Sequence, residues 1–556
     1  MARHGQIALL VSFAILPLAV YLRLNSPLIF SRCFPDDPCW LGLDPCWPSV
    51  DAWEQLNALL AGHLISSEKC SELRTRWSIP VTQYEEPFLQ AGDECTIGPL
   101  AHYTANVTSA TDVQKVIEFT TRHNIRPSIR NTGDDYLGRS TAPSAVALWM
   151  HNLKFTEYRP EYTSSWYTGP ALRIGAGVQG HEAQEAAHRA GQGYVIMSAH
   201  SPDVEIAGGY TQGGGYGPLA SKYGLAADQV LEWEVVTAGA EILTASPEQN
   251  ADLYWALSGG GGGTYGVVLG MTVRMHGEDQ TASASLVFSF DPADTRAWDV
   301  IRAFISDTLP LVDAGGTALW VLYPGPTVEE SVTFIARPLT LPGGTKEELQ
   351  AYITSTVDLL SEYGIPYELT SETFPTYHAS TTSAAYNVTE FHGGSLLIHR
   401  SAVDSNMDGF VSIMQSLLGS GAAVSGFSVN VSHPVVLPVA NKAVTPTWRK
   451  AAISLIIGLP FNYTDRYENI NHEILMTHVL VPKLADFARS TGEEVGAYMN
   501  EGDWDQRDWQ SVLYGENYEH LLAIKDKYDP EHIFYSRTGV GSDRWGEDPD
   551  GRLHRA

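Results

Sequence analysis

Three short stretches of small residues constrain this chain more than any other feature. The first is Asn131-Thr132-Gly133-Asp134-Asp135, the second runs from Gly208 to Gly217, and the third runs from Gly259 to Gly263. Glycine loses more backbone entropy on folding than any other residue, so such runs persist where a backbone must approach something closely. Apolar, strand-like sequence flanks each stretch, which argues against flexible linkers. Together they predict one large, phosphate-bearing ligand held between three loops.

The sequence before the first stretch predicts how that loop is presented. Ser109-x-x-Asp112 has the form of a capping box, and the helix it opens has one apolar face. A short β-prone run, Pro127 to Arg130, follows and leads into the polar turn. A helix, a strand and a loop with free N–H groups can together receive an anion. Alone, such a loop is more often a plain surface turn, and the glycine stretches downstream favour the phosphate interpretation.

These segments resemble the FAD-binding domain of the vanillyl-alcohol-oxidase and p-cresol-methylhydroxylase (PCMH) superfamily, in particular its berberine-bridge-enzyme-like branch in fungi. The match covers residues 95–278 and resumes near the C-terminus, at Tyr498-x-Asn500, Tyr514 to Tyr518 and Lys527 to Pro530. The resemblance implies an α+β fold: a two-lobed PCMH-type FAD-binding domain plus an antiparallel-sheet substrate domain flanked by helices. It also implies an FAD-linked oxidoreductase.

The sequence divides into six expected segments. They are a signal peptide or signal anchor (1–25), a disulfide-rich N-terminal extension (26–94), the FAD-binding PCMH-type domain (95–278), the substrate domain (279–494), a C-terminal return to the FAD domain (495–545) and a disordered polar tail (546–556). The first lobe of the FAD domain is expected to run to about Val178 and to include the strand Leu172 to Gly175. Helices are expected at Val50 to Leu60, His181 to Arg189, Thr345 to Tyr363 and Glu473 to Ser490.

Charge and cysteine usage limit the partners and the compartment. The net charge of −29, from 35 basic and 64 acidic residues, disfavours nucleic acid and anionic membranes as partners because such a surface repels phosphates. All five cysteines lie in the first 95 residues, in a pattern that predicts disulfides and not a metal site. They are Cys33, Cys39, Cys46, Cys70 and Cys95. Because the count is odd, one thiol is left over or pairs outside the chain.

The N-terminus predicts a secretory route. An apolar run from Ile7 to Leu22 has the length of a signal-peptide core and is short for a membrane-spanning helix. A cleaved signal is favoured over an uncleaved anchor, so a membrane is a partner only if this segment stays attached. Four Asn-x-Ser/Thr sites fit glycosylation in that route, at Asn106, Asn387, Asn430 and Asn462.

The resemblance also names the residues expected to bind FAD. The first loop and its neighbourhood would cradle the pyrophosphate, the second loop would pass close to the cofactor, one strand would meet the flavin, and a C-terminal segment would return to it. These residues are Arg130, Asn131, Thr132, Gly133, Asp134, Asp135, Ser140, Ser201, Val204, Gly208, Gly209, Gly213, Gly214, Gly215, Tyr216, Gly217, Val267, Val268, Asn517 and Tyr518.

Two of these positions depart from the family pattern. Relatives usually have a histidine where this chain has Asp134, and that histidine bonds covalently to the flavin; some add a cysteine in the stretch that aligns with Ser201. The neighbouring His200 is a less favoured substitute, since adjacent residues on a strand face opposite sides. The departures predict FAD held without a covalent bond. Val204, where a small apolar residue accompanies oxygen access in relatives, favours an oxidase.

The function expected from this is an FAD-dependent oxidase of a small, secondary-metabolite-like substrate, with hydride passing to flavin N5 and then to O2. Tyr498 and Asn500 resemble a catalytic pair on the substrate side of the ring. The phenol of Tyr498 serves as the base only if its pKa is lowered. Tyr498 is equally well interpreted as a core tyrosine whose hydroxyl has a hydrogen-bond partner. The alternatives are a non-redox cyclase or pericyclase with FAD idle or structural, and a secreted binding or storage protein.

Overall fold

Two small sheets form the part of the chain that carries the glycine stretches. The computed structural model describes residues 46–67, 100–191, 193–325, 331–381, 391–432, 442–462, 464–490, 492–547 and 553–556. The first sheet has the order β1-β2-β4-β3, from Leu64–Ser66, Tyr103–Asn106, Val146–Trp149 and Pro127–Arg130, with parallel pairing of β4 to both β2 and β3. Its strand β3 ends where the first loop begins, as the sequence predicts.

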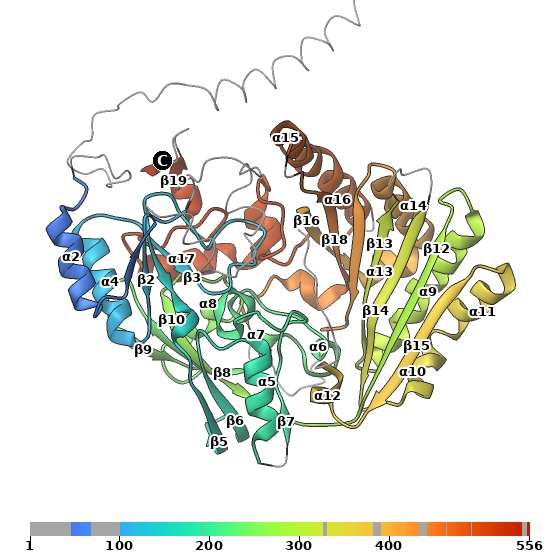
Figure 1. The fold of residues 1–556 in the computed structure, drawn as a ribbon, viewed down its shortest axis with the longest axis horizontal. Coiled ribbons are helices and arrows are strands. Elements are labelled where there is room, and N and C mark those ends of the chain that lie inside the picture. The colour runs from blue at the N-terminus through green and yellow to red at the C-terminus, as the bar shows by residue number, and fades with distance from the viewer. Residues whose placement is uncertain are drawn as a thin grey trace, which may run out of the picture.

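The second sheet lies beside the first and carries the other two glycine stretches on its connections (Figure 1). Its order is β5-β6-β10-β8-β9, from Thr156–Thr163, Thr168–Gly175, Val267–Arg274, Val230–Val236 and Ile242–Ala245. We assigned the strand at 172–175 to the first lobe, and this is wrong, because β6 pairs with β10 along Ala171 to Gly175. The first lobe therefore ends before β5, not near Val178.

Helices and short turns complete the FAD-binding part. They are α2 (Val50–Leu59), α4 (Ala110–Arg122), α5 (Gly180–Arg189), α6 (Ala220–Tyr223), α7 (Ala226–Gln229), α8 (Ala251–Leu257), α17 (Tyr518–Tyr528), the π-turn η3 (Ile206–Tyr210) and the 3-10 turn η2 (Met150–Asn152). The capping box of α4 forms as predicted, with Ser109 accepting from the Asp112 N–H. Helices α2 and α5 also match the sequence prediction. However, α2 and β1 belong structurally to the first lobe, although we placed them in a separate extension.

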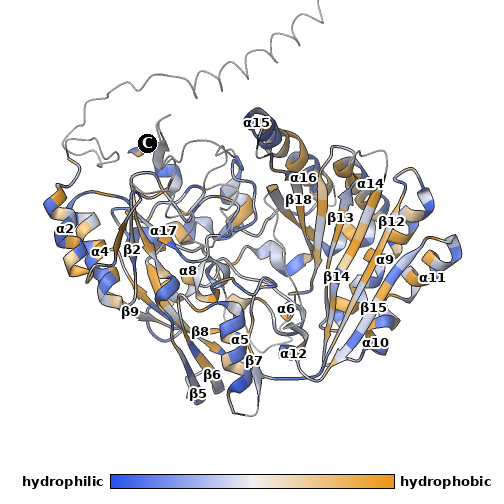
Figure 2. Ribbon diagram, viewed as in Figure 1, coloured by the Kyte–Doolittle hydropathy of each residue, from blue (hydrophilic) through white to orange (hydrophobic). Residues whose placement is uncertain are grey.

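A seven-stranded antiparallel sheet forms the core of the second domain. Its order is β15-β12-β14-β13-β17-β18-β16, from Tyr367–Phe374, Thr281–Phe290, Val332–Pro342, Thr317–Pro324, Ala423–Ser428, Ala451–Pro460 and Phe391–His399. Helices cover the face turned away from the FAD-binding part (Figure 1). The α+β architecture with an antiparallel substrate domain is thus confirmed. Figure 2 shows mostly apolar central strands and a polar edge strand β15, in agreement with its exposed residues.

The helices of this domain refine the sequence prediction. They are α9 (Thr295–Asp313), α10 (Lys346–Tyr352), α11 (Thr354–Tyr363), α12 (Tyr377–Thr381), α13 (Arg400–Ser405), α14 (Met407–Leu418), α15 (Arg466–Leu475) and α16 (Val481–Arg489), with the turns η4 (Pro446–Lys450) and η5 (Met476–Leu480). The single helix expected over Thr345 to Tyr363 is two, because the backbone leaves helical geometry at Ile353. The helical run expected from Glu473 starts earlier, at Arg466.

The described residues near the C-terminus, 545–547 and 553–556, form paired strands, although we expected a disordered tail over 546–556. Strand β19 (Trp545–Glu547) pairs with β20 (Leu553–Arg555), and the Arg555 guanidinium stacks over the Trp545 ring at 5.5 Å. The turns η6 (Gln510–Tyr514), η7 (Gly515–Asn517) and η8 (Ser542–Arg544) precede this hairpin. The sequence prediction failed here because the pairing depends on contacts between residues that are polar and uninformative by themselves.

Several sequence predictions concern the chain's exterior. In the described part of the chain, no helix is both long enough and apolar enough to cross a membrane. The segment 1–25, Asn387 and four of the cysteines lie outside the described residues, whereas Cys46 is disulfide-bonded. The amide of Asn430 donates to Asp313 at 2.8 Å, and the Asn462 side chain caps its own turn by accepting from the Thr464 N–H at 2.8 Å. Glycosylation at Asn106, Asn387, Asn430 and Asn462 stays a prediction.

Candidate functional site

The three glycine stretches meet in the folded chain. A β-carbon added to Gly208 would lie 2.7 Å from Cβ of Asn131, so the first and second loops touch only because Gly208 has no side chain. A β-carbon on Gly262, in the third stretch, would lie 2.9 Å from Cα of Gly209 in the second. Glycine is needed at such approaches because any side chain would collide with the neighbouring loop. The stretches therefore form one site, as their recurrence in the sequence predicted.

The first loop presents a row of backbone donors. Among the described residues, the N–H groups of Thr132, Gly133, Asp134 and Asp135 have no hydrogen-bond acceptor, although Gly133 is buried. Buried N–H groups are almost always paired, so four consecutive unpaired donors indicate a place for an acceptor from outside the chain. Gly133 has φ of +88°, which turns the peptide planes into a concave arrangement typical of anion sites. This cradle fits a pyrophosphate.

A buried carboxylate fixes the base of the cradle. Glu205, only 2% exposed, accepts from Asn131 Nδ2 at 3.0 Å and lies 2.6 Å from His151 Nδ1. Its own N–H donates to Thr132 Oγ1 at 2.7 Å. The Asn131 amide also donates to the Ala176 carbonyl at 2.8 Å. Side chains of Asn131 and Thr132 thus tie the loop to the protein and leave its N–H groups facing the other way.

Asp135 and Ser140 shape the far end of the same loop. The Asp135 carboxylate accepts from the N–H groups of Leu137 at 3.2 Å and Arg139 at 2.9 Å, and from the Ser140 hydroxyl at 2.9 Å. Both side chains are therefore engaged within the loop itself. Any contribution of Asp135 to cofactor binding comes from its backbone N–H. Arg130, at the end of β3, is buried and adds positive charge beside Asp134.

By the resemblance described above, Asp134 corresponds to the position of the tethering histidine. Solvent reaches its carboxylate, yet protein atoms surround it, and this desolvation raises the pKa of Asp134 to about 6. The negative charges of Asp135, Asp203 and Glu205 raise the pKa further, against the opposing effect of Arg130. The electrostatic coupling to Asp203 places the stretch that follows Ser201 beside the first loop, as the resemblance implied. Asp134 is therefore mostly ionised at pH 7 and takes up its proton as the pH falls through about 6.

The second loop has one glycine that faces open space and several that pack inside the protein. A β-carbon on Gly209 would meet nothing nearer than Asn500 Oδ1, at 3.9 Å. In contrast, one on Gly217 would lie 2.1 Å from the Ser198 carbonyl oxygen, and Gly213, Gly214 and Gly215 are closely packed against Asn500, Val444 and Ala226. Gly209 is thus the glycine of this loop whose missing side chain leaves room for a ligand.

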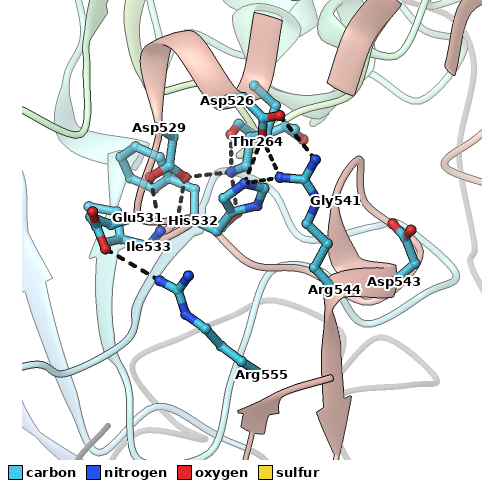
Figure 3. Close-up of polar contacts among 12 residues, drawn as sticks. Thr264, Asp526, Asp529, Glu531, His532, Ile533, Gly541, Asp543, Arg544 and Arg555 are labelled. Atoms are coloured by element: carbon cyan, nitrogen blue, oxygen red, sulfur yellow. Dashed lines mark hydrogen bonds and ion pairs between the residues drawn. The ribbon is translucent and has the colours of Figure 1, made fainter. Parts of the chain in front are cut away.

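A buried lysine supports the third stretch. Lys525 of α17 donates to the carbonyl of Thr264 at 2.6 Å, to Asp529 at 2.5 Å and to the carbonyl of Phe534 at 2.7 Å. Figure 3 shows Asp529 and Thr264 near one another, with Asp526, His532 and Arg544 in an adjoining polar cluster. The C-terminal segment therefore holds the loop that ends at Thr264, which explains why the resemblance resumes there.

Asn517 and Tyr518 support the same region from the interior. The Asn517 amide donates to the carbonyls of Ala443 at 3.2 Å and Val444 at 3.1 Å, and a β-carbon on Gly259 would collide with Val444. The Tyr518 hydroxyl donates to Asp543 and accepts from the Gly541 N–H at 3.3 Å. Their side chains have protein partners, so the structure gives both a packing role. Direct contact with the cofactor stays a prediction.

Tyr498 and Asn500 stand at the second glycine loop. Asn500 Nδ2 donates to the carbonyl of Gly209 at 2.9 Å and to the Tyr498 hydroxyl at 2.7 Å, and that hydroxyl donates to the carbonyl of Tyr210 at 3.2 Å. Burial raises the pKa of Tyr498 well above its ordinary value. A role as base required a lowered pKa, and this condition is not met. The phenol has the properties of a satisfied core tyrosine that positions Asn500.

The sequence analysis missed an acid next to this pair. Glu501 accepts hydrogen bonds from the Tyr216 hydroxyl at 2.8 Å and 2.9 Å, and burial raises the pKa of Glu501 to about 7. Desolvation raises the pKa of Tyr136, and the charges of Glu501 and Asp134 raise it further. Its place directly after Tyr498-x-Asn500 was the available signal. Nothing in the sequence shows, however, that this glutamate is enclosed by tyrosines.

A cavity of about 1800 Å³ lies between the FAD-binding part and the seven-stranded sheet. Tyr136 and His200 line it from one side, and Leu319, Phe391 and Ile456 line it from the sheet. The Tyr136 ring meets Phe391 edge to face at 5.4 Å, close to the first loop. The phosphate cradle and a large chamber for an organic molecule are therefore adjacent.

Among the remaining residues, His200 lines the cavity. Burial lowers the pKa of His200 to about 4, so its imidazole is neutral. The carbonyl of Val204 accepts from the Gly180 N–H at 2.8 Å, which fixes the stretch that begins at Ser201. On β10, Val267 and Val268 face opposite sides of the sheet and belong to different apolar cores. The contacts predicted for these residues with FAD stay predictions.

Comparison with known proteins identifies what such a site holds. Residues 101–246 match the family model described as FAD binding domain, and residues 497–541 match the one described as berberine and berberine like. The chain is 37% identical to the FAD-linked oxidoreductase sor8 of Hypocrea jecorina, over 99% of this chain and 97% of that protein. It is 35% identical to the bifunctional decalin synthase calF of Penicillium decumbens, over 92% of this chain and 94% of that protein.

The fold has a close counterpart among solved structures. The crystal structure of the VAO-type flavoprotein MtVAO615 from Myceliophthora thermophila C1 superposes with a TM-score of 0.83 at 33% identity, covering 93% of this chain and all of that one. The shared fold therefore binds FAD. The unpaired N–H groups of the first loop fit its pyrophosphate, and their contact with it stays a prediction. The chain belongs to the berberine-bridge-enzyme-like branch of the vanillyl-alcohol-oxidase/PCMH superfamily of FAD-linked oxidoreductases.

Proposed function

We propose that this protein is an oxidase that removes hydride from a small secondary-metabolite-like substrate, with FAD held without a covalent bond and O2 as the final acceptor. The observation that carries the proposal is the row of four unpaired N–H groups beside a cavity of about 1800 Å³. FAD supplies the two-electron acceptor when bound. A substrate in the cavity would share the space in front of Gly209 and Tyr136 with it.

The chain's own residues divide the remaining work. The backbone of Thr132 to Asp135 binds the pyrophosphate, and Glu205 holds that loop in place. Asn500 fixes the carbonyl of Gly209, so the second loop keeps its distance from the ring. The apolar side of the cavity, with Leu319, Phe391 and Ile456, excludes water from the reacting atoms.

Three finer points of the proposal rest on the sequence departures and the resemblance. Asp134 and Ser201 stand where relatives carry tethers, and neither a carboxylate nor a hydroxyl is expected to attach to the flavin; this supports non-covalent FAD. Val204 supports access of O2 and an oxidase. The apolar N-terminal run and the Asn-x-Ser/Thr sites support a secreted protein, or one anchored by residues 1–25.

A second function, a non-redox cyclase or pericyclase with FAD idle or structural, is supported by one specific observation. A relative 35% identical over most of both chains is named a bifunctional decalin synthase. A cavity that folds a long substrate against an apolar sheet face would favour ring closure by restricting the chain's conformations. Such a reaction needs no electron acceptor, so the two functions differ in what happens to the flavin.

One experiment separates the two functions. The purified full chain is loaded with FAD and incubated without oxygen with a panel of alcohols and with polyene substrates, while the visible flavin absorbance is followed. An oxidase bleaches with its substrate and regains colour with release of peroxide when air is admitted. A cyclase converts a polyene to an isomer of unchanged mass and leaves the colour unchanged. Acid precipitation of the loaded protein should leave all yellow colour in the supernatant.

A further inference from the structure

A carboxylic acid that the sequence analysis did not single out lies enclosed at the junction of cradle and cavity. Glu501 follows Asn500. The side-chain amide of Asn500 donates to the carbonyl of Gly209 at 2.9 Å, and the backbone carbonyl of Asn500 accepts from the Tyr136 N–H at 2.8 Å. This backbone path fixes Glu501 between the second glycine loop and Tyr136, which lines the cavity. The position is set by hydrogen bonds from both loops and not by a flexible surface segment.

Tyrosines surround this carboxyl group. Tyr216, from the second glycine loop, donates its hydroxyl to both carboxylate oxygens, at 2.8 Å and 2.9 Å. Tyr136 comes from the first loop and Tyr498 from Glu501's own segment. Desolvation raises the pKa of both phenols, and the negative charge of Glu501 raises it further. Asp134 is the further acidic group that acts on Tyr136. The hydroxyls of these tyrosines hold their protons, so only carboxyls of this cluster change charge near neutral pH: Glu501, with its pKa at about 7, and Asp134, with its pKa lower, at about 6.

We propose that Glu501 accepts the proton of the substrate's hydroxyl group during oxidation, an inference that rests on the proposed function. In this oxidation, an alcohol loses its O–H proton to the Glu501 carboxylate as its C–H bond breaks. The hydride leaves with its electron pair to oxidised FAD, and the carbon–oxygen double bond forms. The alcohol is oxidised and the cofactor reduced. The proton on Glu501 then returns to solvent before the next turnover.

The titration of this group suits the task. Burial raises the pKa of Glu501 to about 7, and the hydrogen bond from Tyr216 opposes that rise by stabilising the charged form. A base whose pKa lies near the working pH is both available and strong enough to take a proton. Tyr216 also orients the carboxylate, and its ring packs edge to face on Tyr498 at 5.3 Å.

The chain offers a matched control two residues away. Asp503 is also buried, and burial raises the pKa of Asp503 to about 7. Its carboxylate accepts from the Thr477 hydroxyl at 2.9 Å in the substrate domain and is influenced by Glu473, not by the tyrosine cluster. Asp503→Asn therefore removes a comparable buried acid that has no place in the proposed reaction.

The test uses the FAD-loaded full chain and a panel of primary and secondary aliphatic and benzylic alcohols, without oxygen. In the wild type, the rate of flavin bleaching should rise with pH through about 7, as Glu501 loses its proton. Glu501→Gln should bleach on the order of 10²–10⁴-fold more slowly and lose that pH step. Glu501→Asp should retain the step at a reduced rate. Asp503→Asn should keep both the step and the rate.

A second measurement does not depend on turnover. Infrared titration of the loaded protein should show an absorption of protonated carboxyl groups that disappears around pH 7. Glu501→Gln should lack one component of this absorption, and Asp503→Asn should lack another. Both variants should bind FAD with unchanged affinity. A pH step that survives in Glu501→Gln, or that both variants lose, overturns the inference. A wild-type flavin that no alcohol bleaches overturns the proposed function instead, and the inference fails with it.

Discussion

At the scale of single residues, the proposal that FAD is held without a covalent bond depends on Asp134. It stands where relatives carry the histidine that bonds to the flavin, and its pKa is raised to about 6 because protein atoms and three neighbouring acids disfavour its charge. We predict that Asp134→His restores a covalent bond. After acid precipitation, the variant's pellet should be yellow, whereas the wild type should release its FAD. Asp134→Asn, which removes the charge without adding a nucleophile, should also release it, and a colourless Asp134→His pellet would contradict the prediction.

The same residue shows what the sequence can and cannot provide. The departure at Asp134 is visible in the sequence because the surrounding motif is intact. The role proposed for Glu501 is not visible in the sequence, since it depends on Tyr136 and Tyr216, which lie 365 and 285 positions away. Likewise, the raised pKa of Tyr498 follows from burial that no local pattern reveals. Residue types were therefore predictable at the site, whereas their protonation states were not.

At the scale of elements, the glycine loops make a prediction that separates folding from binding. A β-carbon on Gly209 meets no protein atom nearer than 3.9 Å, so Gly209→Ala should leave the unfolding free energy of the FAD-free protein unchanged within about 0.5 kcal/mol. It should nevertheless weaken FAD binding, because the added methyl enters the space kept for the cofactor. Flavin fluorescence titration measures the affinity, and urea denaturation measures the stability.

The control for this variant is Gly239→Ala, at an equally open position whose nearest neighbour, Thr237 Oγ1, is 3.9 Å away. It lies in the turn between β8 and β9, outside the three glycine stretches, and should change neither quantity. Equal FAD affinity for Gly209→Ala and the wild type would show that the second loop does not face the cofactor.

Lys525 carries the second prediction at this scale. Lys525→Met leaves Asp529 as a buried carboxylate without its cation and frees the Thr264 carbonyl, so it should destabilise the protein by about 3–5 kcal/mol. FAD affinity should fall with it, since the third stretch loses its support. Lys527→Met is the matched control: that lysine is 59% exposed and pairs with Asp252 at the surface, so its removal should cost less than about 1 kcal/mol. Comparable losses in both variants would contradict the role of the buried pair.

Elements defined by local patterns were predicted well, and those defined by distant pairing were not. Helix α4 has its capping box and α5 ends before Gly191, because both signals lie within a few residues. The membership of β6 in the second sheet depends on β10, about 100 positions later in the sequence. The break at Ile353 and the β19–β20 hairpin likewise follow from tertiary packing that overrides propensity.

At the scale of the whole molecule, the second sheet joins two apolar cores. Along β8 and β10, side chains alternate between them: Val235 and Val268 lie in the core shared with the substrate domain, and Val236 and Val267 lie in the core of the first lobe. The core on the substrate side extends without interruption from Trp233 to residues of the seven-stranded sheet. This continuous core couples the two domains and fixes the position of the cradle relative to the cavity.

An ion pair across the domains tests that coupling. Arg449 of η4 binds Asp228 of α7 through two contacts of 2.7 Å and 2.8 Å, and Asp228 is only 1% exposed. Arg449→Met should destabilise the protein by about 3–5 kcal/mol, because it leaves a buried carboxylate unpaired. In calorimetry, we expect one transition in the wild type and one, at lower temperature, in the variant, since a shared core unfolds as a unit.

The adjacent Lys450 provides the control for this prediction. It is 59% exposed and pairs with Glu493 at the surface, so Lys450→Met should lower the free energy of unfolding by less than about 1 kcal/mol. If the wild type shows two transitions and Arg449→Met shifts only one, the domains unfold independently and the shared core does not couple them. If Arg449→Met instead shifts one single transition to lower temperature, the two domains unfold together. The position of the flavin cradle then depends on the substrate domain, and substitutions in that domain, far from the loops, will change FAD affinity.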